Sequence, residues 1–138
     1  MTEALSVGTT ATRHFTVDES RTIDFMGKDA QVYATPALVR DIEQTCRDLI
    51  VEHVSDAEDS VGFEVSIKHL APTLLGMDVA ITAAVTEIDG PKVVLEFMAT
   101  DPTDKICAGK HVRFIVDVEK TKQRLKAKAE KVAAIDPS

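Results

Sequence analysis

The stretch YATPALVRDIEQTCRDL, residues 33–49, carries the clearest helix signal in the chain. Thr35 is a good N-cap residue, and Pro36 suits the first helical position because its fixed φ is already helical. Glu43 lies just beyond the edge of the apolar face of this helix. At 100° per residue, an arc of about 120° collects seven side chains: Leu38, Val39, Ile42, Cys46, Leu49, Ile50 and His53. We therefore predict an amphipathic helix that begins at Thr35 or Pro36 and buries one face.

From Val61 the apolar period changes from helical spacing to two. Val61, Phe63, Val65, Ile67 and His69 alternate with polar or small residues, so His69 is expected to share an inward face with four apolar side chains. A histidine in such a position is either a satisfied core residue or part of a site.

The rest of the chain reads as further strands and one more helix. Strands are predicted at 13–17, 77–88, 92–100 and 105–118, a loop at 18–34 and a basic helix at 119–134. The joints DGP (89–91) and DPTD (101–104) are tight-turn sequences suited to antiparallel hairpins. One central helix followed by a long antiparallel meander predicts an α+β hot-dog fold, in a single domain over residues 1–138.

Composition and charge exclude several classes of protein. The chain of 138 residues has 44% hydrophobic and 28% charged residues, and no segment reaches the roughly 20 apolar residues of a membrane span. The start of the chain lacks the pattern of a secretory signal, so the cytoplasm is the expected location. Residues 105–138 hold nine Lys and Arg against four Asp and Glu, about +5 of a net −7, which leaves about −12 on residues 1–104. This acidic bulk argues against nucleic acid as a partner.

The two cysteines are too few for a disulfide scaffold and lack the CxxC spacing of zinc or redox sites. Cys46 and Cys107 are expected to be buried small hydrophobic residues. We expect no metal and no tightly bound cofactor.

Three residues have the chemistry that hydrolysis of a thioester requires. Glu43, at the rim of an apolar helix face, suits direct attack on a carbonyl or deprotonation of a water. His69 can orient that carboxylate or protonate a departing thiolate, and Thr35 can donate a hydrogen bond to the acyl oxygen. Each has a structural alternative: Glu43 as a partner of Arg47, His69 as a core histidine and Thr35 as a helix cap. The other histidines, His14, His53 and His111, are expected to be structural or exposed.

These residues and their spacing resemble the hot-dog acyl-CoA thioesterases of the fluoroacetyl-CoA thioesterase type. The resemblance runs from about VGTTATRHFTV to Val118 and rests on the motifs YATPA, VRDIEQTCR, EVSIKHLAP and GKHVR. The catalytic threonine, glutamate and histidine of the family are matched by Thr35, Glu43 and His69, and its substrate-binding glycine and arginine by Gly62 and Arg113. The resemblance implies hydrolysis of a small acyl-CoA, and a homodimer because the family's sites lie near the subunit interface.

The segment before Thr35 departs from the family pattern. FMGKDAQVY replaces an aromatic-rich lid, with Met26 and Asp29 where bulky aromatics are expected, which predicts a looser and more polar wall. We therefore expect fluoroacetyl-CoA not to be strongly preferred over acetyl-CoA. Two other functions remain as alternatives: a hot-dog enoyl-CoA hydratase, whose usual Asp and His pair we do not find, and an acyl-CoA binding module without turnover.

Overall fold

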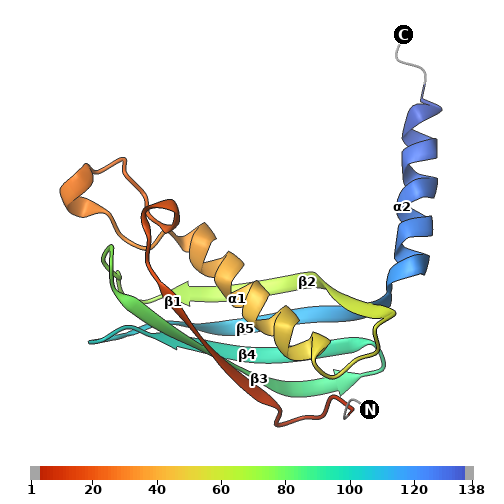
Figure 1. Cartoon of the computed structure of the whole chain (residues 1–138), viewed down its shortest axis with the longest axis horizontal. Helices are drawn as coiled ribbons and strands as arrows, with labels where there is room; N and C mark the ends of the chain where they lie inside the picture. Colours follow the sequence, from red (N-terminus) through yellow and green to blue (C-terminus); the bar gives the residue numbers. More distant parts are fainter. Residues whose placement is uncertain (1–3, 136–138) are drawn as a thin grey trace.

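The computed structural model describes residues 4–135 as one antiparallel sheet with a helix across it. The five strands lie in the order β1-β3-β4-β5-β2, so β1 and β2 form the two edges. Their bounds are β1 Thr10–Thr16, β2 Glu58–His69, β3 Asp78–Asp89, β4 Lys92–Thr100 and β5 Lys105–Asp117. All four pairings are antiparallel, and the two predicted tight turns join β3 to β4 and β4 to β5. Figure 1 shows the long helix α1, Thr35–Val51, lying across one face of the sheet.

The apolar face of α1 forms the core with the sheet. Leu38, Ile42, Cys46 and Ile50 have no exposed surface, and Leu49 is also buried. They pack in one cluster with side chains from the middle strands. The predictions for both cysteines are confirmed: they are buried free thiols, and burial raises the pKa of Cys46 to about 12 and that of Cys107 to about 11.

The start of α1 differs from the prediction. Ala34 is the N-cap residue and makes no side-chain cap, Thr35 is the first helical residue, and Pro36 occupies the next position. The Thr35 hydroxyl is therefore not used to cap the helix. It bonds instead to a side chain from the far end of β2, which sequence spacing along the helix does not reveal.

The prediction that one face of β2 holds Val61 to His69 is wrong in its first half. The register between β2 and β5 shifts between Gly62 and Glu64, so Phe63 is an extra, unpaired residue. Such a bulge reverses the alternation of faces. Phe63 makes an edge-to-face ring contact with Phe114 at 5.0 Å, on the side away from α1. Gly62 comes to lie on the α1 side with His69.

The chain ends in α2, Val118–Ala133, whose N-cap Asp117 accepts a hydrogen bond from the Lys120 backbone N–H. No residue of α2 is buried, and Figure 1 shows the helix projecting away from the sheet. The predicted basic helix at 119–134 is thus present, and its basic residues are not buried. Between residues 4 and 135, none of the helices combines the length and the apolar character that crossing a membrane requires.

Candidate active site

The first group of site residues is a hydrogen-bonded pair. Thr35, at the start of α1, and His69, at the end of β2, come together with Thr35 Oγ1 and His69 Nδ1 2.8 Å apart. Burial lowers the pKa of the His69 imidazole, so the ring is neutral near pH 7. Its other nitrogen, Nε2, is buried and has no hydrogen-bond partner among residues 4–135. A buried polar atom without a partner is costly, which points to a missing group at this position.

An open cavity of about 590 Å³ lies beside this pair. Its walls are the segment before α1, the first turn of α1 and the chain just after β2. The lining residues are Ile23, Phe25, Val32, Tyr33, Ala34, Thr35, Pro36, His69, Leu70, Ala71 and Pro72. None of them carries a fixed charge. The prediction of a polar wall is therefore wrong, because Ile23, Phe25 and Val32 face the cavity in place of Met26 and Asp29.

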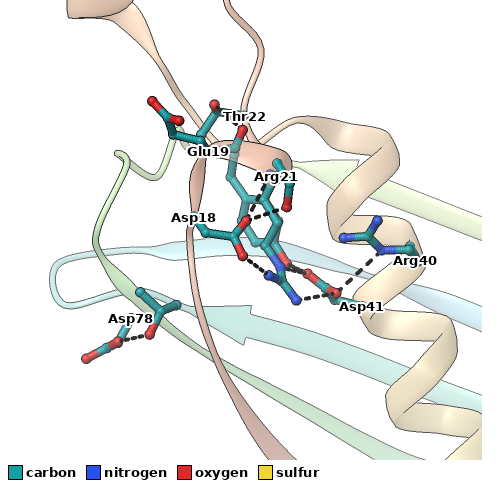
Figure 2. A network of polar contacts seen from close by, with 10 residues as sticks. Asp18, Glu19, Arg21, Thr22, Arg40, Asp41 and Asp78 are labelled. Atoms are coloured by element: carbon teal, nitrogen blue, oxygen red, sulfur yellow. Dashed lines mark hydrogen bonds and ion pairs between the residues drawn. The ribbon is translucent and has the colours of Figure 1, made fainter.

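A buried polar network holds the segment before α1 in place. Asp41 on α1, only 3% exposed, accepts hydrogen bonds from Arg21 Nε at 2.8 Å and Nη2 at 3.2 Å, and a short one from the Tyr33 hydroxyl. Figure 2 shows Arg21 between Asp18 and Asp41, with Asp18 Oδ2 2.7 Å from Arg21 Nη1. Burial and the adjacent Asp41 raise the pKa of the Tyr33 phenol, so it remains a donor. The segment is thus attached to α1 at both of its ends.

The second group of site residues surrounds Glu43. A Cβ atom on Gly62 would lie 3.0 Å from Glu43 Oε1 and 3.6 Å from both Arg113 Nη1 and His111 Cε1. The absence of a side chain at Gly62 therefore leaves room for the carboxylate. The Glu43 side chain is 41% exposed and lines an open pocket with Arg40, Gly62 and Arg113, among others.

Arg113 is buried, 7% exposed, and most of its donors are used inside the protein. Its Nε donates to Ser60 Oγ at 2.7 Å and its Nη2 to the Ser60 carbonyl at 2.8 Å. Its Nη1 donates to His111 Nε2 at 3.2 Å. Arginine can only donate, so His111 Nε2 must accept, and the His111 Nδ1–H then donates to the Glu64 carbonyl at 2.8 Å.

The neutral state of His111 decides its relation to Glu43. Burial lowers the pKa of His111, which favours the neutral ring that accepts from Arg113. His111 Nε2 and Glu43 Oε1 are 3.9 Å apart, but without a proton on that nitrogen they are not an ion pair. The positive charge that faces Glu43 is therefore that of Arg113. This leaves Arg113 poorly placed for bidentate binding of a substrate phosphate.

The two groups of residues lie apart within one chain. Eight residues separate Thr35 from Glu43 on α1, which at 1.5 Å per residue is about 12 Å along the helix axis. Within one subunit, Thr35 contacts His69, and Glu43 lies beside Gly62 and Arg113. These two groups of residues do not contact each other.

Comparison with known proteins identifies the chain's relatives. A family model described as fluoroacetyl-CoA-specific thioesterase matches residues 17–119. The chain belongs to this family. A fluoroacetyl-CoA thioesterase from Streptantibioticus cattleyicolor is 25% identical over 135 residues, which cover 93% of this chain and 97% of that enzyme.

Solved structures of thioesterases superpose closely and confirm the predicted hot-dog fold. A variant of the fluoroacetyl-CoA-specific thioesterase gives a TM-score of 0.83 at 25% identity, covering 91% of this chain and 98% of that one. A thioesterase superfamily member from Thermus thermophilus gives 0.86 at 26% identity, covering 94% and 97%. Another structure of the variant holds fluoroacetate and CoA, with a TM-score of 0.78 at 26% identity over 85% of this chain and 99% of that one.

Sequence reasoning did not single out three residues that lie beside the two groups: His111, Ser60 and Phe25. His111 was expected to be structural or exposed, although GKHVR places His111 and Arg113 two residues apart and hence on one face of β5. The same spacing places Ser60 beside Gly62. Phe25 lies in an irregular segment, where no periodicity indicates the direction of a side chain.

No group of three or more His, Cys, Asp and Glu side chains within residues 4–135 is arranged to hold a metal ion. The functional groups of the two groups of residues are a hydroxyl, two imidazoles, a carboxylate and a guanidinium. These are the groups of acid–base and nucleophilic chemistry.

Proposed function

We propose that this chain is a single-domain acyl-CoA thioesterase whose site uses Thr35, His69 and Glu43. The observation that carries the proposal is the Thr35–His69 pair at the mouth of an uncharged cavity, in a chain that belongs to a thioesterase family. The position of Glu43 beside a glycine and a buried arginine adds the carboxylate that such a reaction needs.

A homodimer would unite the two groups of residues. β2 is an edge strand, and three of its apolar side chains, Val61, Phe63 and Val65, are 40% to 68% exposed. Edge strands of this kind are usually paired or covered. If two copies of β2 pair antiparallel about a two-fold axis at Ser66, each Ser66 lies opposite its own copy. Because Phe63 is an extra residue in the strand, His69 of one copy then lies opposite Gly62 of the other. Glu43 of one subunit then approaches the Thr35–His69 pair of its partner, where His69 Nε2 lacks a hydrogen-bond partner.

The chemistry follows from these positions. The acyl carbonyl oxygen accepts hydrogen bonds at the positive end of the α1 dipole. The donors are the first-turn N–H groups other than Pro36, which has none, and the Thr35 hydroxyl. The hydroxyl proton is available when His69 Nδ1–H donates to Thr35 Oγ1. Glu43 either attacks the carbonyl carbon or removes a proton from a water that does so. In either route the C–S bond breaks, the electron pair goes to sulfur, and the thiolate takes up a proton to give CoA. Attack by water gives the carboxylic acid directly, whereas attack by Glu43 first gives a mixed anhydride, which a water then hydrolyses to the carboxylic acid and free Glu43. One water is consumed in both routes.

A panel of acyl-CoA esters with a free-thiol readout tests the function. Hydrolysis releases CoA, hydration of an enoyl-CoA does not, and a binding module raises the melting temperature without either reaction. We expect Glu43→Gln and His69→Ala each to lower kcat/KM by at least about a hundredfold while the fold is retained. Near-native turnover by Glu43→Gln would show that the assigned role is wrong.

Mixed dimers test the shared site. His69→Ala and Glu43→Gln homodimers each lack one member of both sites, but a mixed dimer has one site with all members intact. We expect purified mixed dimers to recover about half of the wild-type activity. A site contained within one chain predicts no recovery.

A further inference from the structure

The cavity beside Thr35 and His69 is the place where the acyl part of a thioester can lie. Its residues include the Thr35–His69 pair itself, so a group that occupies it lies beside the two side chains proposed to act on the thioester carbonyl. At about 590 Å³ it is of a size typical for small-molecule sites. A two-carbon acyl group would fill only a small part of it.

The chemistry of the wall selects among the parts of an acyl-CoA. Six apolar lining residues come from two segments: Ile23, Phe25 and Val32 precede α1, and Leu70, Ala71 and Pro72 follow β2. The wall has no Lys or Arg for a phosphate or a carboxylate, and a chain of methylenes needs no polar partner. Phe25 is 79% exposed and Leu70 54% exposed in the single polypeptide, and an apolar acyl chain lying against them would bury part of this surface.

The wall is held in place before any ligand binds. Ile23 and Val32 belong to the segment that the Arg21–Asp41 pair and the Tyr33 hydroxyl attach to α1 (Figure 2). The Ile23 N–H also donates to the Val32 carbonyl at 3.2 Å, and Val32 pairs with Leu74 as an isolated bridge. Because the cavity wall is already ordered, binding an acyl chain against it costs less entropy.

We infer that the preferred substrates carry an unbranched, uncharged acyl chain of about six to eight carbons, and that this chain lies between Phe25 and Leu70. The inference rests on the proposed thioesterase function. A fully buried methylene is worth about a fourfold factor, and the cavity is open on one side. Counting half of that free energy, the four methylenes that separate hexanoyl from acetyl give about fifteenfold in kcat/KM.

Steady-state kinetics on the full-length protein test the inference with acetyl-, fluoroacetyl-, butyryl-, succinyl-, hexanoyl- and octanoyl-CoA. We expect hexanoyl-CoA to exceed acetyl- and fluoroacetyl-CoA by at least about fifteenfold. Succinyl-CoA, which matches butyryl-CoA in length but carries a carboxylate, should be at least about tenfold poorer than butyryl-CoA. Equal rates across the series, or a preference for either two-carbon ester, would overturn the inference.

Substitutions in the cavity wall test where the acyl chain lies. Phe25→Ala and Leu70→Ala should each lower the ratio of kcat/KM for hexanoyl-CoA to kcat/KM for acetyl-CoA about fivefold. Leu125→Ala is the matched control, because Leu125 is 62% exposed on α2 and does not line the cavity. An equal effect of Phe25→Ala and Leu70→Ala on both esters would contradict the placement.

A binding measurement separates failure of this inference from failure of the proposed function. If no ester releases CoA, the proposed function is wrong, and calorimetry with the non-hydrolysable thioethers S-hexyl-CoA and S-ethyl-CoA still decides the question of chain length. Tighter binding of the hexyl compound by about fifteenfold supports the inference, and equal binding overturns it.

Discussion

At the scale of single residues, the neutral ring of His111 determines how Arg113 faces Glu43. The ring is 1% exposed, and it accepts from Arg113 on one side while it donates to the Glu64 carbonyl on the other. Ser60 takes two further donors of the same guanidinium. In the proposed site, His111 and Ser60 are positioning residues, which act on Glu43 through Arg113.

A pair of substitutions at His111 tests this positioning role. His111→Leu removes the acceptor for Arg113 Nη1 and leaves a buried charged donor unsatisfied, which typically costs about 1 to 3 kcal/mol. We expect kcat to fall about tenfold to a hundredfold with little change in KM. His111→Gln, whose amide oxygen can accept from Arg113, should restore most of kcat. If both variants lose stability equally and keep kcat, the role of His111 is purely structural.

At the scale of elements, the attachment of the segment before α1 depends on one buried carboxylate. Asp41 is 3% exposed and accepts from both Arg21 and Tyr33. Arg40 lies farther away, with its Nε 3.9 Å from Asp41 Oδ1 and its side chain 62% exposed. Arg21 is therefore the main charge partner of Asp41, and its removal leaves a buried carboxylate with little compensation, which is strongly destabilising.

Tyr33→Phe and Arg21→Leu test this attachment with different expected costs. Loss of a hydrogen bond to a charged group costs about 1.5 to 3 kcal/mol, and loss of the buried partner charge about 3 to 5 kcal/mol. Urea unfolding should thus rank the two variants with Arg21→Leu the less stable. Thr16, whose hydroxyl donates to Asp78 at 2.9 Å on the exposed surface, provides the control Thr16→Val, with an expected change below about 0.5 kcal/mol. The reverse order would show that Arg21 contributes little at Asp41.

The helices and strands could be predicted from the sequence, but the bulge in β2 and the contacts of Thr35 and Phe25 could be predicted only in part. Periodicity located α1 and the strands because core packing imposes it directly. An isolated glycine in a strand often marks a bulge, so Gly62 contained a signal for the change of face at Phe63. No local signal showed that the Thr35 hydroxyl would bond to His69, because that contact joins residues 34 apart in sequence. The direction of Phe25 depends on the Arg21–Asp41 attachment, which is likewise non-local.

At the scale of the whole molecule, β2 is an edge strand whose outer side has no neighbouring strand in a single subunit. The 15.0 kDa chain should form a homodimer of about 30 kDa at micromolar concentration, measured by light scattering. A stable monomer would remove the basis for the shared site.

Charge substitutions at Ser66 test whether β2 is the dimer edge. Ser66 is exposed near the middle of β2, so pairing about a two-fold axis there places the two copies of residue 66 close together. Like charges opposite each other across paired strands are destabilising, and opposite charges contribute about 0.2 to 1 kcal/mol. Ser66→Glu and Ser66→Lys should each weaken the dimer and lower activity at low protein concentration. An equal mixture of the two variants should restore both dimer and activity, because each Glu then faces a Lys. If both variants weaken the dimer and the equal mixture does not restore it, the dimer contact lies elsewhere on the molecule.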